Sequence, residues 1–247
     1  MLPLPLVRNK QSVAVIGFDG IDSTLMRDSA LLQFAMAAIL LTDVSSACAI
    51  GPAVAGVIFQ NACAQCHGAK GEGNVQIKAP SIASLPAWYV RAQLENFRAD
   101  RRGAHPQDAE GQLMPAISKV LDDEQVIAVA EFISKLPRVI PQPTIKGDVA
   151  TGRLLYEERC MECHRFNGEG ELVFGAAPLV GLPDWYLAGQ MRKYRDRVRG
   201  VQKEDANGQK MAWAAQFIET EELLQSVAAY LMTLQQKQPP EQFDFGK

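Results

Sequence analysis

The chain has 247 residues, 47% of them hydrophobic, and a formal net charge of -3 at neutral pH. This length suits one or two compact domains, each with an apolar core of its own. The charge is too close to neutral to indicate a nucleic-acid partner, and we expect none.

Residues 1–49 are predicted to be a leader and not part of the fold. The apolar run Ala30–Leu41 is too short to span a bilayer, which takes roughly 20 residues. A basic residue precedes it, and Ser46–Ala49 offers small residues for cleavage, as in a secretory signal peptide. Two alternatives stay open, an uncleaved membrane anchor and a lipid anchor at Cys48. All three place the body of the chain in the periplasm, with peripheral membrane association in the last two.

Two copies of a Cys-x-x-Cys-His motif follow the leader, at residues 63–67 and 160–164. A redox dithiol would be expected in a βαβ setting, which the sequence does not show. Zinc needs a fourth soft ligand, and the remaining histidine, His105, corresponds to Gln202 in the second copy. The motif is instead the attachment signal for c-type haem. The sequence therefore predicts two covalently bound haem c groups, attached through Cys63, Cys66, Cys160 and Cys163 and ligated by His67 and His164.

An internal repeat relates the two motifs, because residues of the first half reappear 97 positions later. The repeat needs one apparent slip, in which Pro80 pairs with Pro178. It predicts three parts: the leader at 1–49, module one at 50–140, and module two at 141–247 with a polar C-terminal tail. The proline-bearing segment 136–144 is predicted to be an extended connector.

Both modules are predicted to be helical, with no convincing strand. In chain order the expected helices cover 53–67, 86–100, 122–136, 183–197 and 220–234. Pro86 is expected at the first position of its helix, and Asp122 and Gln125 form the pattern of a capping box. The sequence thus indicates an all-α chain of two small tandem domains, in which another group helps to fill each core.

A sixth iron ligand should be a side chain that occupies the same place in both copies. Met114 and Met211 each lie 47 residues after their motif histidine. Methionine often merely fills a core, but histidine–methionine ligation is common in electron-transfer haem c. We predict that Met114 and Met211 bind the two irons. An iron with both axial positions taken passes electrons and cannot bind substrate, so no catalytic residue is expected.

The stretches "NACAQCHGAKGEGN", "APSIASLPAWYVRAQLENFRADRRG" and "QLMPAISKVLDDEQVIAVAEFIS", with their weaker copies, resemble the dihaem class I cytochromes c of the c4 type. The resemblance covers about residues 55–235. It implies two tandem class I cytochrome c domains, each wrapped around one covalent haem. It also implies electron transfer from a quinol-oxidising complex or a dehydrogenase to an acceptor such as a terminal oxidase. Module two departs from the pattern at Trp213 and at 165–167.

Two further groups of residues are candidates for the haem pockets. Paired basic clusters are most simply solvated helix ends, but their guanidinium groups also suit propionate carboxylates. Paired aromatic residues are expected in the core against the haem, where a Trp or Tyr could reach a propionate. The basic candidates are Arg98, Arg102, Arg195 and Arg199, and the aromatic candidates are Trp88, Tyr89, Trp185 and Tyr186.

Two rival functions stay open at this point. One is a dihaem enzyme, a peroxidase or sulfur-compound dehydrogenase, which would need one iron with an open or labile site. The other is an electron-transfer subunit tethered in a larger redox complex, with the polar tail as its binding segment.

Overall fold

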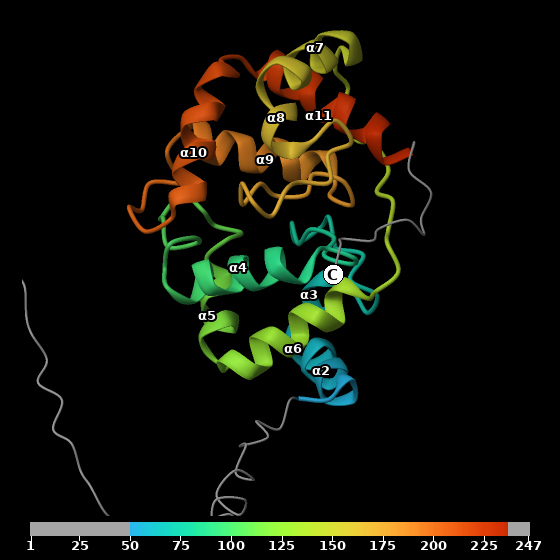
Figure 1. Ribbon diagram of the computed structural model, residues 1–247, viewed down its shortest axis with the longest axis vertical. Helices are drawn as coiled ribbons and strands as arrows, with labels where there is room; N and C mark the ends of the chain where they lie inside the picture. Colours follow the sequence, from blue (N-terminus) through green and yellow to red (C-terminus); the bar gives the residue numbers. More distant parts are fainter. Residues whose placement is uncertain (1–49, 237–247) are drawn as a thin grey trace, which may run out of the picture. The chain divides into compact units, whose positions relative to one another are not determined.

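The computed structural model describes residues 50–236, so the leader, its predicted signal and lipid anchor, and residues 237–247 lie outside the described range. The described chain is helical, and its only β pairing is two isolated bridges, Asn74–Ala79 and Glu171–Ala176. The all-α prediction is therefore confirmed. Module one contains α2 (Pro52–Ile58), the π-helix η1 (Phe59–Cys63), α3 (Ala64–His67), α4 (Ala87–Arg98), α5 (Leu113–Lys119) and α6 (Asp123–Ser134). Module two contains α7 (Val149–Arg159), α8 (Met161–His164), α9 (Asp184–Arg195), α10 (Ala206–Ala214), the 3-10 helix η2 (Ala215–Phe217) and α11 (Glu221–Gln236) (Figure 1).

The predicted helices are present, with small shifts at their ends. Asp122 accepts a hydrogen bond from the backbone N–H of Gln125, whose side chain accepts one from the backbone of Asp122, so the predicted capping box is confirmed. Pro86 was expected inside the helix but is the N-cap residue of α4, because its extended ψ of 137° precedes the first helical turn. The helices α5 and α10, which carry Met114 and Met211, were not predicted.

The repeat holds without a slip, so the pairing of Pro80 with Pro178 is wrong. In each module a carbonyl 13 residues after the motif histidine accepts a hydrogen bond from that histidine, and these carbonyls belong to Pro80 and Ala177. The flanking bridges also keep the constant offset of the repeat. Backbone hydrogen bonds set the path of this loop in both modules. The proline can therefore stand one position later in module two without changing that path.

Glycine permits the tight turn after each motif. Gly73 and Gly170 have φ angles of 88° and 78°, which favour glycine. An added Cβ would lie 2.5 Å from the backbone nitrogen of Ser81 or 2.4 Å from the carbonyl oxygen of Ala176. The Gly-Glu-Gly stretches are thus turns that bring the following loop back over the histidine.

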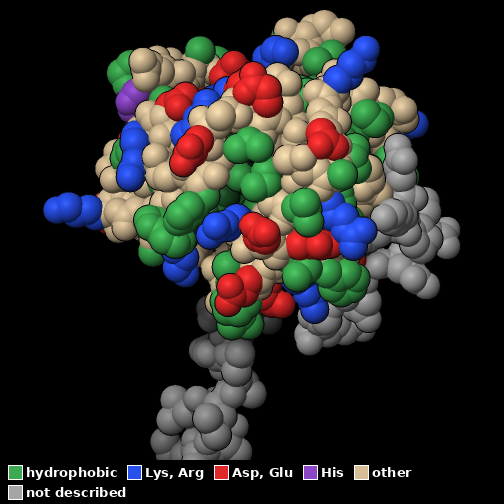
Figure 2. Space-filling model, turned by 90° about the horizontal axis from the view of Figure 1, so that it is seen from above, with side chains coloured by type: hydrophobic (Ala, Val, Ile, Leu, Met, Phe, Trp, Pro, Cys, Tyr) green, Lys and Arg blue, Asp and Glu red, His purple; other side chains and the backbone are tan. Residues whose placement is uncertain are grey.

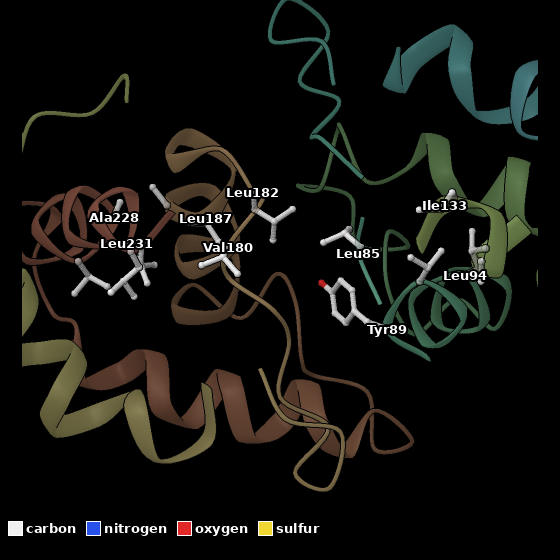
Figure 3. Close-up of a cluster of buried hydrophobic side chains, with 14 of the residues drawn as sticks. Leu85, Tyr89, Leu94, Ile133, Val180, Leu182, Leu187, Ala228 and Leu231 are labelled. Atoms are coloured by element: carbon white, nitrogen blue, oxygen red, sulfur yellow. The ribbon is translucent and has the colours of Figure 1, made fainter. Parts of the chain in front are cut away.

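One apolar core runs through both modules. Helix α4 packs on α6 in module one, and α11 packs on α7 and α9 in module two. Leu85 and Tyr89 belong to the same buried cluster as Val180, Leu182 and Leu187 (Figure 3). Neither module therefore closes its core alone, which agrees with the modest aliphatic content of each.

The connector between the modules is extended, as predicted, and a buried carboxylate holds it. Asp184, at the start of α9, accepts hydrogen bonds from the backbone N–H groups of Thr144 and Ile145 at 2.5 and 2.7 Å. It also accepts one from the Thr144 hydroxyl at 2.7 Å. Four hydrogen bonds in all, including one from Trp185 N–H, compensate the burial of this charge.

The surface carries mixed charge. On the face seen in Figure 2, basic and acidic side chains are interspersed with apolar ones, so no large field of one sign covers it. No helix among residues 50–236 is long and apolar enough to cross a membrane.

Candidate haem sites

The first motif lies where the π-helix passes into α3. Cys63 is half-buried and Cys66 is exposed, and both thiols are free. Burial, with a smaller contribution from Cys66, raises the pKa of Cys63 to about 11. The π turn places both sulfurs and His67 on one short stretch of helix. Such stretches of π-helix are common at functional sites.

His67 is held in one orientation. Its Nδ1 donates to the carbonyl oxygen of Pro80 at 2.8 Å, since a carbonyl can only accept. The opposite ring nitrogen, Nε2, is then the acceptor that can bind a metal. Burial lowers the pKa of His67, which favours the neutral imidazole that metal binding requires.

A cavity of about 580 Å³ brings the predicted ligands of module one together. Cys63, Cys66, His67 and Met114 all line it, although Met114 is 47 residues away in sequence. Its remaining wall is mostly apolar and includes Leu94 and Phe97 of α4 and Leu121, which follows α5. Two thiols, one oriented imidazole and one thioether around an apolar cavity fit a covalently attached haem. Among residues 50–236, no group of three or more His, Cys, Asp or Glu side chains is placed to hold a metal ion.

Module two completes this cavity, which the sequence did not indicate. Leu182, Trp185, Tyr186, Gln190 and Lys193, all in or next to α9, line it together with the residues of module one. Among the aromatic candidates, Tyr89, Trp185 and Tyr186 line the cavity. Trp88 is half-buried and packs edge-on against Tyr89, with 5.8 Å between ring centroids.

The second motif repeats the local arrangement of the first. His164 Nδ1 donates to the carbonyl oxygen of Ala177 at 2.8 Å, and burial lowers its pKa. Burial also raises the pKa of Cys160 to about 12, while Cys163 is exposed. Met211 is half-buried on α10 and packs against a small buried cluster of Tyr194, Ala212 and Ala215.

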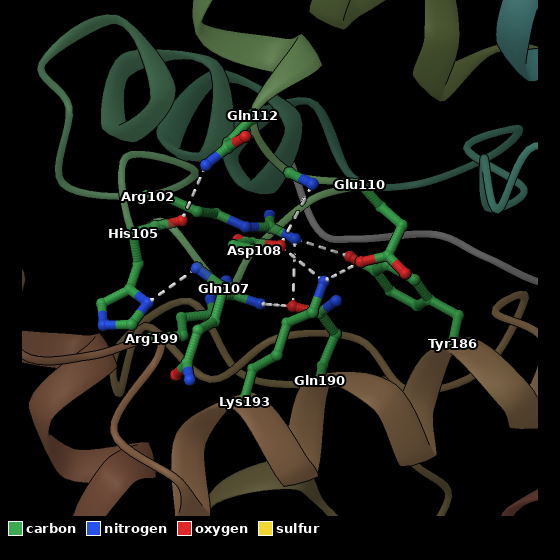
Figure 4. Close-up of polar contacts among 11 residues, drawn as sticks. Arg102, His105, Gln107, Asp108, Glu110, Gln112, Tyr186, Gln190, Lys193 and Arg199 are labelled. Atoms are coloured by element: carbon green, nitrogen blue, oxygen red, sulfur yellow. Dashed lines mark hydrogen bonds and ion pairs between the residues drawn. The ribbon is translucent and has the colours of Figure 1, made fainter.

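Crossed hydrogen bonds join the modules at two arginines, and Figure 4 shows those that Gln190 accepts. Gln93 Oε1 accepts from Arg102 of its own module at 2.6 Å and from Arg199 at 2.9 Å. Gln190 Oε1 accepts from Arg199 of its own module at 2.6 Å and from Arg102 at 3.3 Å. Each arginine also stacks on a ring of its own module, Phe97 or Tyr194. The buried guanidinium groups of Arg102 and Arg199 therefore lie at the junction between the modules.

The other two predicted arginines lie elsewhere. Arg98 binds Asp123 and the carbonyl of Asp122 at the start of α6. Arg195 forms ion pairs with Asp196 and Glu221. These two arginines join helix ends within their own modules, which is the alternative interpretation of the basic clusters. His105 is a loop residue, and its Nδ1 accepts a hydrogen bond from the backbone N–H of Gln107.

The junction is not symmetric. Arg102 also donates to the hydroxyl of Tyr186 at 2.8 Å. Burial alone would raise the pKa of Tyr186, but the charges of Arg102 and Arg199 lower it below its usual value. Burial raises the pKa of the corresponding Tyr89 to about 12. Lys193 of α9 adds a one-sided ion pair to Asp108 at 2.5 Å and Glu110 at 2.8 Å.

Comparison with known proteins agrees with this geometry. The cytochrome c family model matches residues 55–137 and 149–235. A thiosulfate dehydrogenase electron acceptor from Stutzerimonas stutzeri is 30% identical over 186 residues, which cover 72% of this chain and 81% of that protein. The cbb3-type oxidase subunit FixP from Bradyrhizobium diazoefficiens is 30% identical over 132 residues, covering 50% of this chain but only 42% of that protein.

Among solved structures, reduced cytochrome c4 from Pseudomonas stutzeri superimposes with a TM-score of 0.57 at 20% identity, covering 74% of this chain and 97% of that one. The fold and the two motifs therefore define two tandem class I cytochrome c domains. The chain belongs to the cytochrome c family. It is a dihaem member similar to cytochrome c4, and its two domains carry two covalent haem c groups.

Proposed function

We propose that the chain is a periplasmic electron carrier that accepts single electrons from a dehydrogenase and delivers them to a terminal oxidase. The observation that carries the proposal is the convergence of Cys63, Cys66, His67 and Met114 on one apolar cavity, within a framework that module two repeats. Cys63, Cys66, Cys160 and Cys163 would attach the haems. His67 with Met114, and His164 with Met211, would supply the axial ligands.

A haem iron held by histidine and methionine gains and loses one electron at a raised potential and offers no open coordination position. The chain's own residues keep that arrangement in place. The carbonyls of Pro80 and Ala177 fix the tautomer and orientation of the two histidines. The apolar wall excludes water, which favours a small change of surroundings between the two redox states. Arg102 and Arg199 place two buried positive charges at the junction, where propionate carboxylates would be neutralised.

The relatives support a particular donor. The Stutzerimonas stutzeri protein matches most of the chain and is named as the electron acceptor of thiosulfate dehydrogenase. We infer that an enzyme of this class reduces the present chain. Similarity to part of an oxidase subunit supports a cbb3-type oxidase as the acceptor.

The first test is the visible spectrum of the reduced, purified protein before and after addition of carbon monoxide. An unchanged spectrum is expected, because both methionines would fill the sixth positions. A change in about half of the haem would show one open iron and favour a dihaem enzyme instead.

The donor is tested separately. Purified thiosulfate dehydrogenase with thiosulfate should reduce the oxidised chain, and omission of the enzyme should abolish the reaction. Absence of reduction with active enzyme would contradict this choice of donor and leave the carbon monoxide result unaffected.

A further inference from the structure

Module two exposes a pair of aromatic side chains on α10 and η2. Trp213 is 66% exposed and Phe217 is 41% exposed. Their ring centroids are 4.9 Å apart, with the planes nearly perpendicular. The two rings pack against each other, yet a large part of each remains open to solvent. Large exposed aromatic side chains are enriched at the centres of protein interfaces, so this pair needs an explanation.

The aromatic pair adjoins the second haem site. Trp213 lies on α10, two residues after Met211. The guanidinium of Arg159 lies over the ring of Phe217, 5.0 Å from its centroid, and Arg159 directly precedes Cys160. Phe217 is therefore in contact, through Arg159, with the segment that would attach the haem, and Trp213 shares a helix with the predicted methionine ligand. A protein bound here would lie beside the second haem.

Module one offers no such pair. The repeat places Ala116 opposite Trp213 and Val120 opposite Phe217. Val120 is 75% exposed, so the position is open to solvent in both modules. The aromatic rings are therefore specific to module two, at a position that is exposed in both copies. Neither aromatic residue belongs to the buried cores. The buried cores therefore do not require these rings.

Charge at the ends of the pair indicates the kind of partner. Lys210 is three residues before Trp213 on the same helix, which places both on one face. Lys210 and Arg159 are exposed, and neither forms an ion pair with a described residue; Lys210 makes one long contact, of 3.4 Å, to the Asn207 amide. Exposed Glu158 and Glu162 flank Arg159 in sequence, so the positive charge is local. A complementary surface would be apolar at its centre and acidic at its rim.

We propose that the strip Lys210, Trp213, Phe217 and Arg159 is the docking surface through which module two exchanges electrons with a redox protein that presents an apolar centre and rim carboxylates. This inference rests on the proposed electron-carrier function. In each encounter one electron leaves the reduced partner and converts one ferric haem to ferrous, with no transfer of atoms. A small strip suits an encounter that must also dissociate quickly.

The test measures how fast thiosulfate-reduced thiosulfate dehydrogenase reduces the dihaem chain in a stopped-flow instrument. Trp213→Ala should lower the second-order rate constant about tenfold, as expected for an interfacial tryptophan. Val120→Ala is the matched control, because it trims an exposed apolar side chain at the corresponding surface of module one. Ascorbate, a small reductant that needs no docking surface, should reduce all variants equally and shows that the haems are intact.

Salt dependence supplies a second, independent variant. Lys210→Gln should lower the rate at low ionic strength and flatten its decrease with added salt, because one screened attraction is lost. Equal rates for the wild type, Trp213→Ala and Lys210→Gln would overturn the docking surface while leaving the carrier function intact. An equal loss in Val120→Ala would also overturn it, because the effect would not be specific to module two. If the wild type is not reduced by the enzyme at all, the proposed donor fails, and the docking proposal fails with it.

Discussion

Modules one and two follow the same backbone path but solve one turn differently. After its motif histidine, module one turns on Gly68, with φ 84° and ψ 152°. Module two makes the same turn on Arg165, with φ 66° and ψ 162°. This region is almost restricted to glycine and costs other residues about 1–3 kcal/mol.

A hydrogen bond in module two accompanies the strained turn. The buried hydroxyl of Tyr156 donates to the carbonyl oxygen of Arg165 at 2.5 Å. The corresponding residue of module one is Phe59, which is equally buried and has no hydroxyl. The two modules thus differ at two linked positions: Tyr156 replaces Phe59, Arg165 replaces Gly68, and the Tyr156 hydroxyl bonds the Arg165 carbonyl. The two modules therefore keep the same backbone conformation at this turn with different residues.

The largest expected effects test whether the modules share one ligand set. Met114→Ala and Met211→Ala should each make about half of the reduced haem respond to carbon monoxide, because each would open one iron. The visible spectrum measures the responding fraction, with the wild type as the reference. A variant whose spectrum stays unchanged would show that its iron uses a different ligand, and the two modules would then differ in their chemistry.

The next effect concerns the hydroxyl present only in module two. Tyr156→Phe should lower the free energy of unfolding by about 1–3 kcal/mol, because the partly buried carbonyl of Arg165 loses its donor at a strained residue. Urea unfolding of the holoprotein measures the change. Tyr230→Phe is the control, since its ring packs 5.4 Å from that of Tyr156 and no described residue accepts a bond from its hydroxyl. A loss of similar size in both variants would contradict the role given to Tyr156.

A somewhat smaller effect should appear at the turn itself. Arg165→Gly should raise the free energy of unfolding by about 1 kcal/mol, because relief of strain exceeds the extra freedom that glycine gains in the unfolded chain. Removal of the glycine at the corresponding position, in Gly68→Ala, should destabilise module one, where no tyrosine supports the turn. Thermal unfolding of both variants measures the two signs. A change in stability of the same sign in both variants would contradict the strain assigned to Arg165.

The smallest effect tests the one-sided ion pair of the junction. Hydrogen bonding from Lys193 lowers the pKa of Glu110, so this contact stabilises the fold above the ordinary pKa of a glutamate, about 4.5, and the stabilisation is lost as pH falls through the lowered value. Glu110→Gln should cost less than about 1 kcal/mol at pH 7, because the carboxylate is largely exposed. The difference from the wild type should shrink as the pH falls through the lowered pKa of Glu110 and vanish at pH values well below it. A difference that persists there would exclude this electrostatic origin.

Much of the fold could be predicted because the internal repeat allows corresponding residues of the two modules to be compared. The offset between the motifs identified the two modules, the histidines and the paired methionines, and helical periodicity identified α4, α6, α9 and α11. The short helices that carry Met114 and Met211 have few apolar positions of their own, so periodicity did not reveal them. Similarity between the copies also suggested a proline pairing that the backbone does not keep.

The junction could not be predicted, because no pattern within one module encodes it. The ion pair of Lys193 with Asp108 and Glu110 has no equivalent when the two modules are exchanged. The repeat places Asn96 at the position of Lys193 and Asn207 at the position of Glu110. The role of Arg102 and Arg199 was suggested by the repeat, but their equal spacing from Arg98 and Arg195 gave no means to separate the two pairs. Only the fold separates the two pairs, because the position of α9 brings Arg102 and Arg199 to the junction.

The shared wall of the first cavity has a consequence for how the protein is built. Cys63, Cys66 and His67 lie in the first half of the chain, whereas Leu182, Trp185 and Lys193 of the second half line the same cavity. Without residues 182–193, that side of the first cavity would lack its wall. The first half of the duplication therefore needs the second half to enclose its own haem site.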